Sequence, residues 1–144
     1  MNPLNQRAEY GQSVWLDYIR RNLLTGGDLK RLVQEDGLKG LTSNPAIFQK
    51  AITGSSDYDA TLQELAAGPA MDAKQMFEHL ALADIRDAAD QMRPVFEATQ
   101  GRDGYVSMEV SPRLAYDREG TCREARRLWQ EIDRENVMIK VPAT

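Results

Sequence analysis

This sequence of 144 residues has one cysteine, no long apolar stretch and no excess of positive charge. Its one cysteine, Cys122, can form neither an internal disulfide nor a cysteine metal cluster, which is typical of a reducing compartment. No apolar run approaches the roughly 20 residues of a membrane-spanning helix, and the N-terminus lacks the basic-then-apolar pattern of a secretory signal. We therefore expect a cytoplasmic protein that does not bind membranes.

The charge balance argues against a nucleic-acid partner. The formal net charge is −4 and the pI is about 5.1, so no basic surface is predicted. The single histidine, His79, has no acid or cysteine at a spacing typical of metal ligands, and we expect no metal site. No glycine-rich phosphate turn follows the first predicted strand, which disfavours a dinucleotide-binding fold.

Strand-like and helix-like segments alternate along the chain. Compact β-branched and aromatic runs predict strands at 13–19, 38–45, 105–112 and 136–144. Apolar residues at helical spacing predict helices at 28–35, 46–53, 55–67, 71–101 and 117–134. We expect Pro94 to interrupt the fourth helix, and residues 1–12 to be a short lead-in without regular structure.

This order requires parallel strands joined by crossover helices. Such a chain forms either an open doubly wound sheet or part of a (β/α)8 barrel. In each predicted strand the aliphatic side chains share one face, which leaves Asp17, Asn44, Glu109 and Lys140 on the opposite face, near the C-terminal ends of the strands. In a barrel that face is the interior, and these four side chains converge at the C-terminal mouth, where barrel enzymes place their active sites.

Lys140 lies within an otherwise apolar strand, 137–141. A primary amine in apolar surroundings is partly deprotonated and can form a Schiff base with a carbonyl compound, and nearby carboxylates can then transfer protons. Each residue also has a structural explanation. Lys140 can extend to water from a strand end, Asp17 and Glu109 can be solvated strand ends, and Asn44 can be a turn residue before proline.

Two segments, 40–48 and 137–144, resemble the signature segments of transaldolases. The motifs around Asp17 and Glu109 are also similar to those of the family, and the match extends over essentially the whole chain. The sequences of the first predicted strand and of residues 54–59 are similar to those of a bacterial subgroup that includes transaldolases fused to a phosphoglucose isomerase domain. Leu41 departs from the family pattern, where a smaller residue is commoner.

The resemblance implies a pentose-phosphate enzyme that moves a dihydroxyacetone unit between sugar phosphates without a metal or organic cofactor. It implies that Lys140 forms the Schiff base, that Glu109 acts with a water in proton transfer, and that Asp17 serves the acid/base step at the donor hydroxyl. It further implies that Asn44 and Thr42 bind or orient the donor.

The chain is too short for a complete barrel, which needs about 250 residues and eight strands. We expect residues 1–144 to be the N-terminal half of a transaldolase barrel that ends just after the lysine, with little activity alone and with exposed sheet edges that self-associate. Two alternatives stay open: a fructose 6-phosphate aldolase of related architecture, in which a tyrosine would replace Glu109, and a non-catalytic α/β module.

Overall fold

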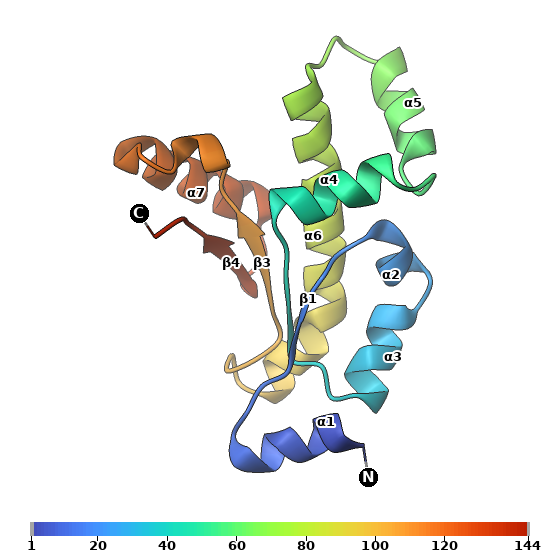
Figure 1. Cartoon of the computed structure of the whole chain (residues 1–144), viewed down its shortest axis with the longest axis vertical. Coiled ribbons are helices and arrows are strands. Elements are labelled where there is room, and N and C mark those ends of the chain that lie inside the picture. The colour runs from blue at the N-terminus through green and yellow to red at the C-terminus, as the bar shows by residue number, and fades with distance from the viewer. Residues whose placement is uncertain (1, 144) are drawn as a thin grey trace.

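Four short parallel strands form one sheet at the centre of the computed structural model, which describes residues 2–143. The strands lie side by side in sequence order: β1 (Trp15–Asp17), β2 (Gly40–Thr42), β3 (Tyr105–Glu109) and β4 (Val137–Lys140). The pairing aligns Asp17 with Thr42 and Glu109 with Lys140. The predicted parallel α/β order is therefore confirmed (Figure 1).

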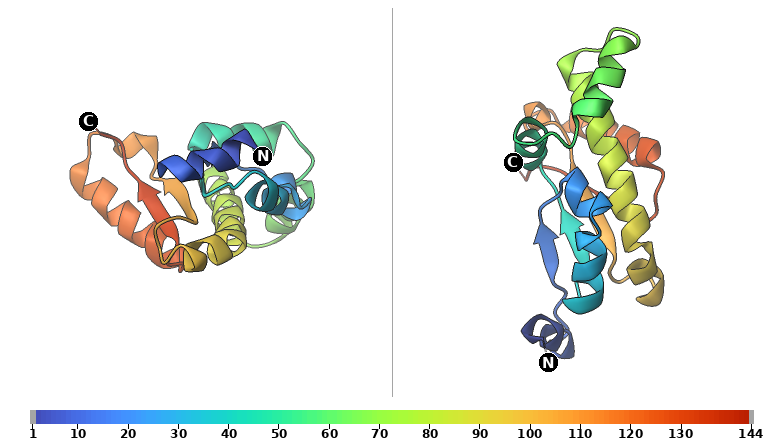
Figure 2. Two further views of the ribbon diagram at one scale, coloured as in Figure 1. Left: turned by 90° about the horizontal axis from the view of Figure 1, so that it is seen from below. Right: turned by 90° about the vertical axis from the view of Figure 1, so that its right-hand side faces the viewer.

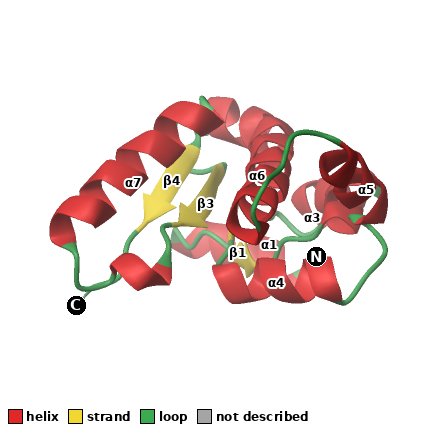
Figure 3. Ribbon diagram, turned by 90° about the horizontal axis from the view of Figure 1, so that it is seen from above, coloured by secondary structure: helices red, strands yellow, loops and turns green. Residues whose placement is uncertain are grey.

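Helices connect the strands. They are α1 (Pro3–Gln6), the 3-10 turn η1 (Arg7–Tyr10), α2 (Arg21–Thr25), α3 (Asp28–Glu35), α4 (Pro45–Thr53), α5 (Asp59–Ala67), α6 (Ala73–Ala98), η2 (Pro112–Leu114) and α7 (Arg118–Ile132). The long crossover helices α3, α6 and α7 lie on the same side of the sheet (Figures 2 and 3). Helix α4 crosses the C-terminal ends of the strands, and α1 lies at their N-terminal ends.

This one-sided arrangement decides between the two predicted architectures. A doubly wound sheet carries helices on both faces and reverses its strand order at a switch point. Here the strand order runs from β1 to β4 without reversal, and the crossover helices cover one face. The sheet therefore has the topology of part of a (β/α)8 barrel, in which the face opposite the helices is the interior.

The core lies between the sheet and α6. Leu41 of β2, Val106 of β3 and Val110 directly after β3 are fully buried, and they pack in one cluster with Ile85 and Met92 of α6. The other strand face is more open, since Met138 is 44% exposed. The alternation thus sends aliphatic side chains to the helices and polar side chains to the interior, as the sequence predicts.

Helix α6 continues through Pro94, so the expected interruption is wrong. The ring lies on an exposed stretch of the helix surface, where a carbonyl that loses its hydrogen bond can be solvated. Meanwhile Met92 and Val95 keep the buried side of the helix packed on the core. A capping box between Asp72 and Gln75 fixes the start of the helix.

Three other expectations were also wrong. Residues 1–12 were expected to have no regular structure, but residues 3–10 form α1 and η1. The Asn2 and Asn5 side chains donate hydrogen bonds to the Glu35 carbonyl and hold this segment against α3. Helix α2, only five residues long, was not predicted, and its apolar pattern is too short to detect. The apolar spacing in 117–134 also predicts that Trp129 lies on the buried side of its helix, but in α7 it is 51% exposed. Among residues 2–143, no helix combines the length and apolar character required to span a bilayer.

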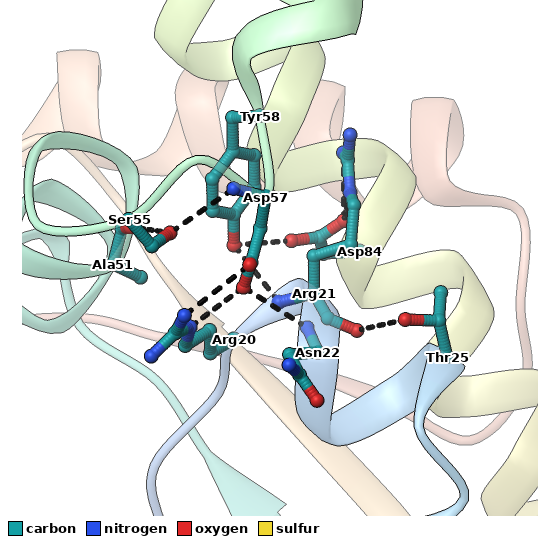
Figure 4. Close-up of polar contacts among 9 residues, drawn as sticks. All are labelled: Arg20, Arg21, Asn22, Thr25, Ala51, Ser55, Asp57, Tyr58 and Asp84. Carbon is teal, nitrogen blue, oxygen red and sulfur yellow. Dashed lines mark hydrogen bonds and ion pairs between the residues drawn. The ribbon is translucent and has the colours of Figure 1, made fainter.

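A polar network joins the turn after β1 to α5 and α6 (Figure 4). The Arg21 guanidinium donates to Asp84 Oδ1 at 2.9 and 3.0 Å, and the buried Tyr58 hydroxyl donates to Asp84 Oδ2 at 2.8 Å. Nearby, Arg20 Nε donates to Asp57 Oδ2 at 2.6 Å. Asp57 also accepts from the backbone N–H of Asn22, in the first turn of α2. The network therefore fixes the segment that directly follows Asp17 and β1.

The two acids of this network respond differently to their surroundings. The hydrogen bond from Arg20 lowers the pKa of Asp57 below its usual value. Burial raises the pKa of Asp84, against the opposing effect of hydrogen bonds from Tyr58 and Arg21. A lowered pKa in the folded state means that Asp57 stabilises the fold above its unfolded pKa of about 3.9. This contribution is lost as the pH falls through the lower, folded value.

The Asp57→Asn substitution tests this contribution. We expect the variant to be less stable than the unsubstituted chain at pH 7, and the difference to shrink as the pH falls below the unfolded pKa of Asp57 and through its lowered pKa in the folded chain. Urea unfolding at several pH values measures it. The control is Asp59→Asn, since Asp59 is exposed and its side chain has no hydrogen-bond partner within residues 2–143. If the stability difference between Asp57→Asn and the unsubstituted chain does not change with pH, the stabilising role of the Asp57 carboxylate is contradicted.

Candidate functional site

Lys140 and Glu109 form an ion pair at the C-terminal ends of β4 and β3. Their Cα positions are register partners, and Lys140 Nζ lies 3.0 Å from Glu109 Oε2. The side chains are 41% and 23% exposed, respectively. The amine is therefore neither in the helix layer nor far from an acid. It is also not in the apolar surroundings expected from the sequence, because its nearest partners in the described chain are polar.

The lysine also reaches a second strand. Lys140 Nζ donates a hydrogen bond of 3.1 Å to the Ser43 carbonyl, directly after β2. Since β3 lies between β4 and β2, the lysine side chain crosses β3 to make this contact. Ser43 is itself buried, and its hydroxyl donates to the Ser107 carbonyl of β3 at 2.7 Å. The amine is thus held by one carboxylate and one backbone carbonyl.

Asp17 and Thr42 form a second pair, on β1 and β2. They are register partners, and the Thr42 hydroxyl donates to Asp17 Oδ1 at 2.6 Å. Asp17 is exposed and Thr42 is half-buried. Both side chains lie on the interior face, and the hydrogen bond leaves the second carboxylate oxygen of Asp17 open to solvent or to a ligand.

Asn44 has a structural role in addition to any role in binding. Its side-chain oxygen accepts from the Ile47 N–H at 3.0 Å and so caps α4, with Pro45 in the first turn. Continuing the β2–β3 register past Leu41↔Val106 places Asn44 beside Glu109, on the same face. The cap fixes the residue at that position, while its amide nitrogen makes no hydrogen bond within residues 2–143.

The structure therefore brings the five predicted residues to the C-terminal ends of the strands. Lys140 and Glu109 form an ion pair, Thr42 donates a hydrogen bond to Asp17, and Asn44 caps α4. The sequence analysis did not include Ser43 in the site, because the alternation along the predicted strand 38–45 places its side chain on the helix side. Its side chain does lie on that side, but its carbonyl binds the lysine, and side-chain patterns carry no signal for such a contact. Among residues 2–143, no three His, Cys, Asp or Glu side chains are arranged to hold a metal ion.

Trp15 and Gly40 lie below the Asp17–Thr42 pair on the same face. They are register partners, and a Cβ atom added to Gly40 would lie 2.4 Å from the Trp15 ring. The indole of β1 thus packs directly over the glycine of β2. Only glycine leaves space for this contact, which supports the interior surface from beneath.

Comparisons with known proteins found a matching family model and several related proteins. A family model described as Transaldolase/Fructose-6-phosphate aldolase matches residues 14–144. Transaldolase 2 of Nostoc punctiforme is 49% identical over 143 residues, which are 99% of this chain and 37% of that protein. The transaldolase of Thiobacillus denitrificans is 49% identical over 144 residues, 100% of this chain and 40% of that protein. The chain spans about two-fifths of the length of these relatives.

The contact between Trp15 and Gly40 gives a stability prediction. We expect Gly40→Ala to destabilise the chain by about 1–3 kcal/mol, because the new methyl group overlaps the indole ring. Thermal or urea unfolding measures the effect. Gly68→Ala is the control, since its Cβ would meet no atom closer than 3.5 Å. In a chain that already carries Trp15→Ala, the further substitution Gly40→Ala should cost little stability. If Gly40→Ala costs as much there as in the unsubstituted chain, the packing argument is contradicted.

Proposed function

The chain belongs to the transaldolase/fructose-6-phosphate aldolase family, and from this membership we propose that it carries the Schiff-base part of a transaldolase active site. The whole enzyme would move a dihydroxyacetone unit from a ketose phosphate to an aldose phosphate, as a step of the pentose phosphate pathway. Residues 1–144 would supply the first four strands of its barrel. The observation that carries the proposal is the 3.0 Å contact between Lys140 Nζ and Glu109 Oε2 on neighbouring parallel strands.

In the proposed reaction Lys140 is the nucleophile. Its nitrogen attacks the ketone carbon of the donor, and loss of the former carbonyl oxygen as water leaves an imine. Both steps need a proton acceptor and donor next to the nitrogen, and Glu109 is placed to be that group, acting with a water. The hydrogen bond to the Ser43 carbonyl supports the role by directing the amine along the interior face.

Asp17, Thr42 and Asn44 would act on the sugar itself. A carboxylate near the imine carbon can take the proton of a donor hydroxyl as the carbon–carbon bond breaks, and Asp17 is proposed for this step. The Thr42 hydroxyl orients one oxygen of Asp17 and leaves the other free. The amide nitrogen of Asn44 can donate a hydrogen bond to a donor hydroxyl, because the cap uses only its oxygen.

A fructose 6-phosphate aldolase is the second candidate, since the matching family model covers both activities. The presence of Glu109 beside the lysine favours transaldolase, because the aldolase alternative expects a tyrosine in that role. The transaldolase names of the relatives point the same way. A purely structural role for Lys140 would give the same two polar contacts, and borohydride trapping separates it from the two enzyme candidates. A cytoplasmic location, proposed from the single exposed thiol Cys122, suits either enzyme.

Two surfaces of this chain would be covered in a complete barrel. The outer edges of β1 and β4 have no strand partner within residues 2–143, and Met138, Val141 and Trp129 near β4 are 44–51% exposed. Unpaired edges beside exposed apolar side chains favour association. We propose that the 144-residue chain self-associates through them.

Light scattering tests the self-association. At micromolar concentration we expect a mass above that of the 16.2 kDa monomer. Replacing Met138 and Trp129 with lysine should move the distribution towards the monomer. A monodisperse monomer of the unsubstituted chain would contradict the proposal.

Borohydride trapping tests the proposed chemistry. With a ketose phosphate, a longer transaldolase that contains these residues should form an imine at Lys140, and hydride reduction should convert it to a stable secondary amine. Mass spectrometry should then find the adduct on the peptide that contains Lys140. The Lys140→Arg variant should give no adduct, while Lys39→Arg, at the opposite end of the strands, should be trapped normally. Adduct formation that survives Lys140→Arg would refute the assignment.

A further inference from the structure

Asp84 of α6 is a buried acid that the proposed reaction does not use. It is 3% exposed, and its carboxylate accepts from the Arg21 guanidinium and from the hydroxyl of the fully buried Tyr58 (Figure 4). The Tyr58 hydroxyl in turn accepts from the Arg21 backbone N–H at 3.0 Å. The Arg21 guanidinium also donates to Thr61 Oγ1 of α5 at 2.9 Å. Arg21, the first residue of α2, is therefore held both by its backbone and by its side chain.

Stability alone does not account for this arrangement. Removing an acid and a guanidinium from water costs free energy that offsets much of their attraction, so apolar side chains of similar volume often stabilise a fold as well. The network instead fixes one geometry, because a carboxylate, a guanidinium and a hydroxyl form hydrogen bonds in specific directions. The geometry that it fixes is that of the segment between β1 and α2.

That segment begins at Asp17. Only three residues separate Asp17, the last residue of β1, from Arg21, and the middle one, Ile19, is fully buried in the core. A segment this short that is held at both ends has few alternative courses. The position of Asp17 therefore depends on the anchor of Arg21 on Asp84 and Tyr58.

The same network closes a ring that joins β1 to β2. From Tyr58 the chain leads back through α4 to the Asn44 cap, and Asn44 lies two residues after Thr42. The ring closes at the 2.6 Å hydrogen bond from the Thr42 hydroxyl to Asp17. It includes the three residues proposed to act on the sugar. The lysine and the glutamate of the site lie outside it, on β4 and β3.

We propose that Asp84 and Tyr58 are positioning residues for Asp17. They act through Arg21 and serve the cleavage of the donor, not the formation of its imine. The inference rests on the function proposed above and deepens it. In the cleavage a hydroxyl proton of the donor passes to Asp17, and the O–H electron pair forms the carbonyl of the leaving aldose phosphate. The electron pair of the broken carbon–carbon bond moves into the protonated imine, which becomes an enamine.

The two steps differ in the mass of the adduct that they leave on Lys140. Reduction of the first imine by borohydride gives an adduct of the intact ketose phosphate. After cleavage the enamine takes up a proton at carbon, and reduction of the resulting imine gives a three-carbon dihydroxyacetone adduct. Mass spectrometry of the peptide that contains Lys140 therefore measures both steps separately.

Trapping at successive times in a longer transaldolase that contains these residues tests the inference. With a ketose phosphate alone, we expect Asp84→Asn to acquire total adduct at close to the unsubstituted rate. The three-carbon adduct should form on the order of 10-fold more slowly, because a small misplacement of a reacting group lowers the rate strongly. Tyr58→Phe removes only the hydroxyl and should shift the adducts in the same direction. It decides the question if Asp84→Asn does not fold.

Asp90→Asn is the matched control. It makes the same change on the same helix and also removes an acid bound to an arginine, since Asp90 Oδ1 accepts from Arg134 Nε at 2.6 Å. This pair lies near the N-terminal end of β4, so both adducts should form normally. The inference is wrong if a folded Asp84→Asn or Tyr58→Phe variant forms the three-carbon adduct at the unsubstituted rate, or if both adducts are slowed equally. Absence of any adduct in the unsubstituted enzyme would instead overturn the proposed function.

Discussion

The parallel pairing of β3 with β4 is the constraint on which the site depends. It aligns Glu109 with Lys140, and the alternation of strand side chains sends both to the same face. The pairing of β1 with β2 does the same for Asp17 and Thr42. A shift of one residue in either ladder would move one partner into the helix layer, so the aliphatic core that fixes the register also fixes the chemistry.

The rest of the architecture maintains these alignments. Helix α6 packs along the sheet and buries the aliphatic face, while α4 begins at the Asn44 cap and closes the C-terminal end of β2. The network of Arg20, Arg21 and Asp84 holds the turn that follows Asp17. Ordinary packing and helix capping therefore supply much of the geometry of the site.

Periodicity predicted the parts of the fold in which one face is buried. The alternation of aliphatic and polar residues in 105–110 and 137–141 predicts that Glu109 and Lys140 share a face, and the structure places them as register partners in a 3.0 Å contact. The short helix α2 and the course of α6 through Pro94 could not be predicted, since they depend on tertiary contacts and on where the ring faces. The contact of Lys140 with the Ser43 carbonyl involves a backbone atom, and the sequence contains no sign of it.

The central claim is that the strand register places Lys140 and its neighbouring acids around one reacting carbon. A crystal structure of a longer transaldolase that contains these residues, trapped by borohydride with a ketose phosphate, tests it most directly. The account predicts a covalent bond from Lys140 Nζ to the substrate carbon, with Glu109 and Asp17 both within hydrogen-bond reach of the adduct, directly or through one water. An adduct on another lysine, or a Lys140 adduct remote from both carboxylates, would contradict it.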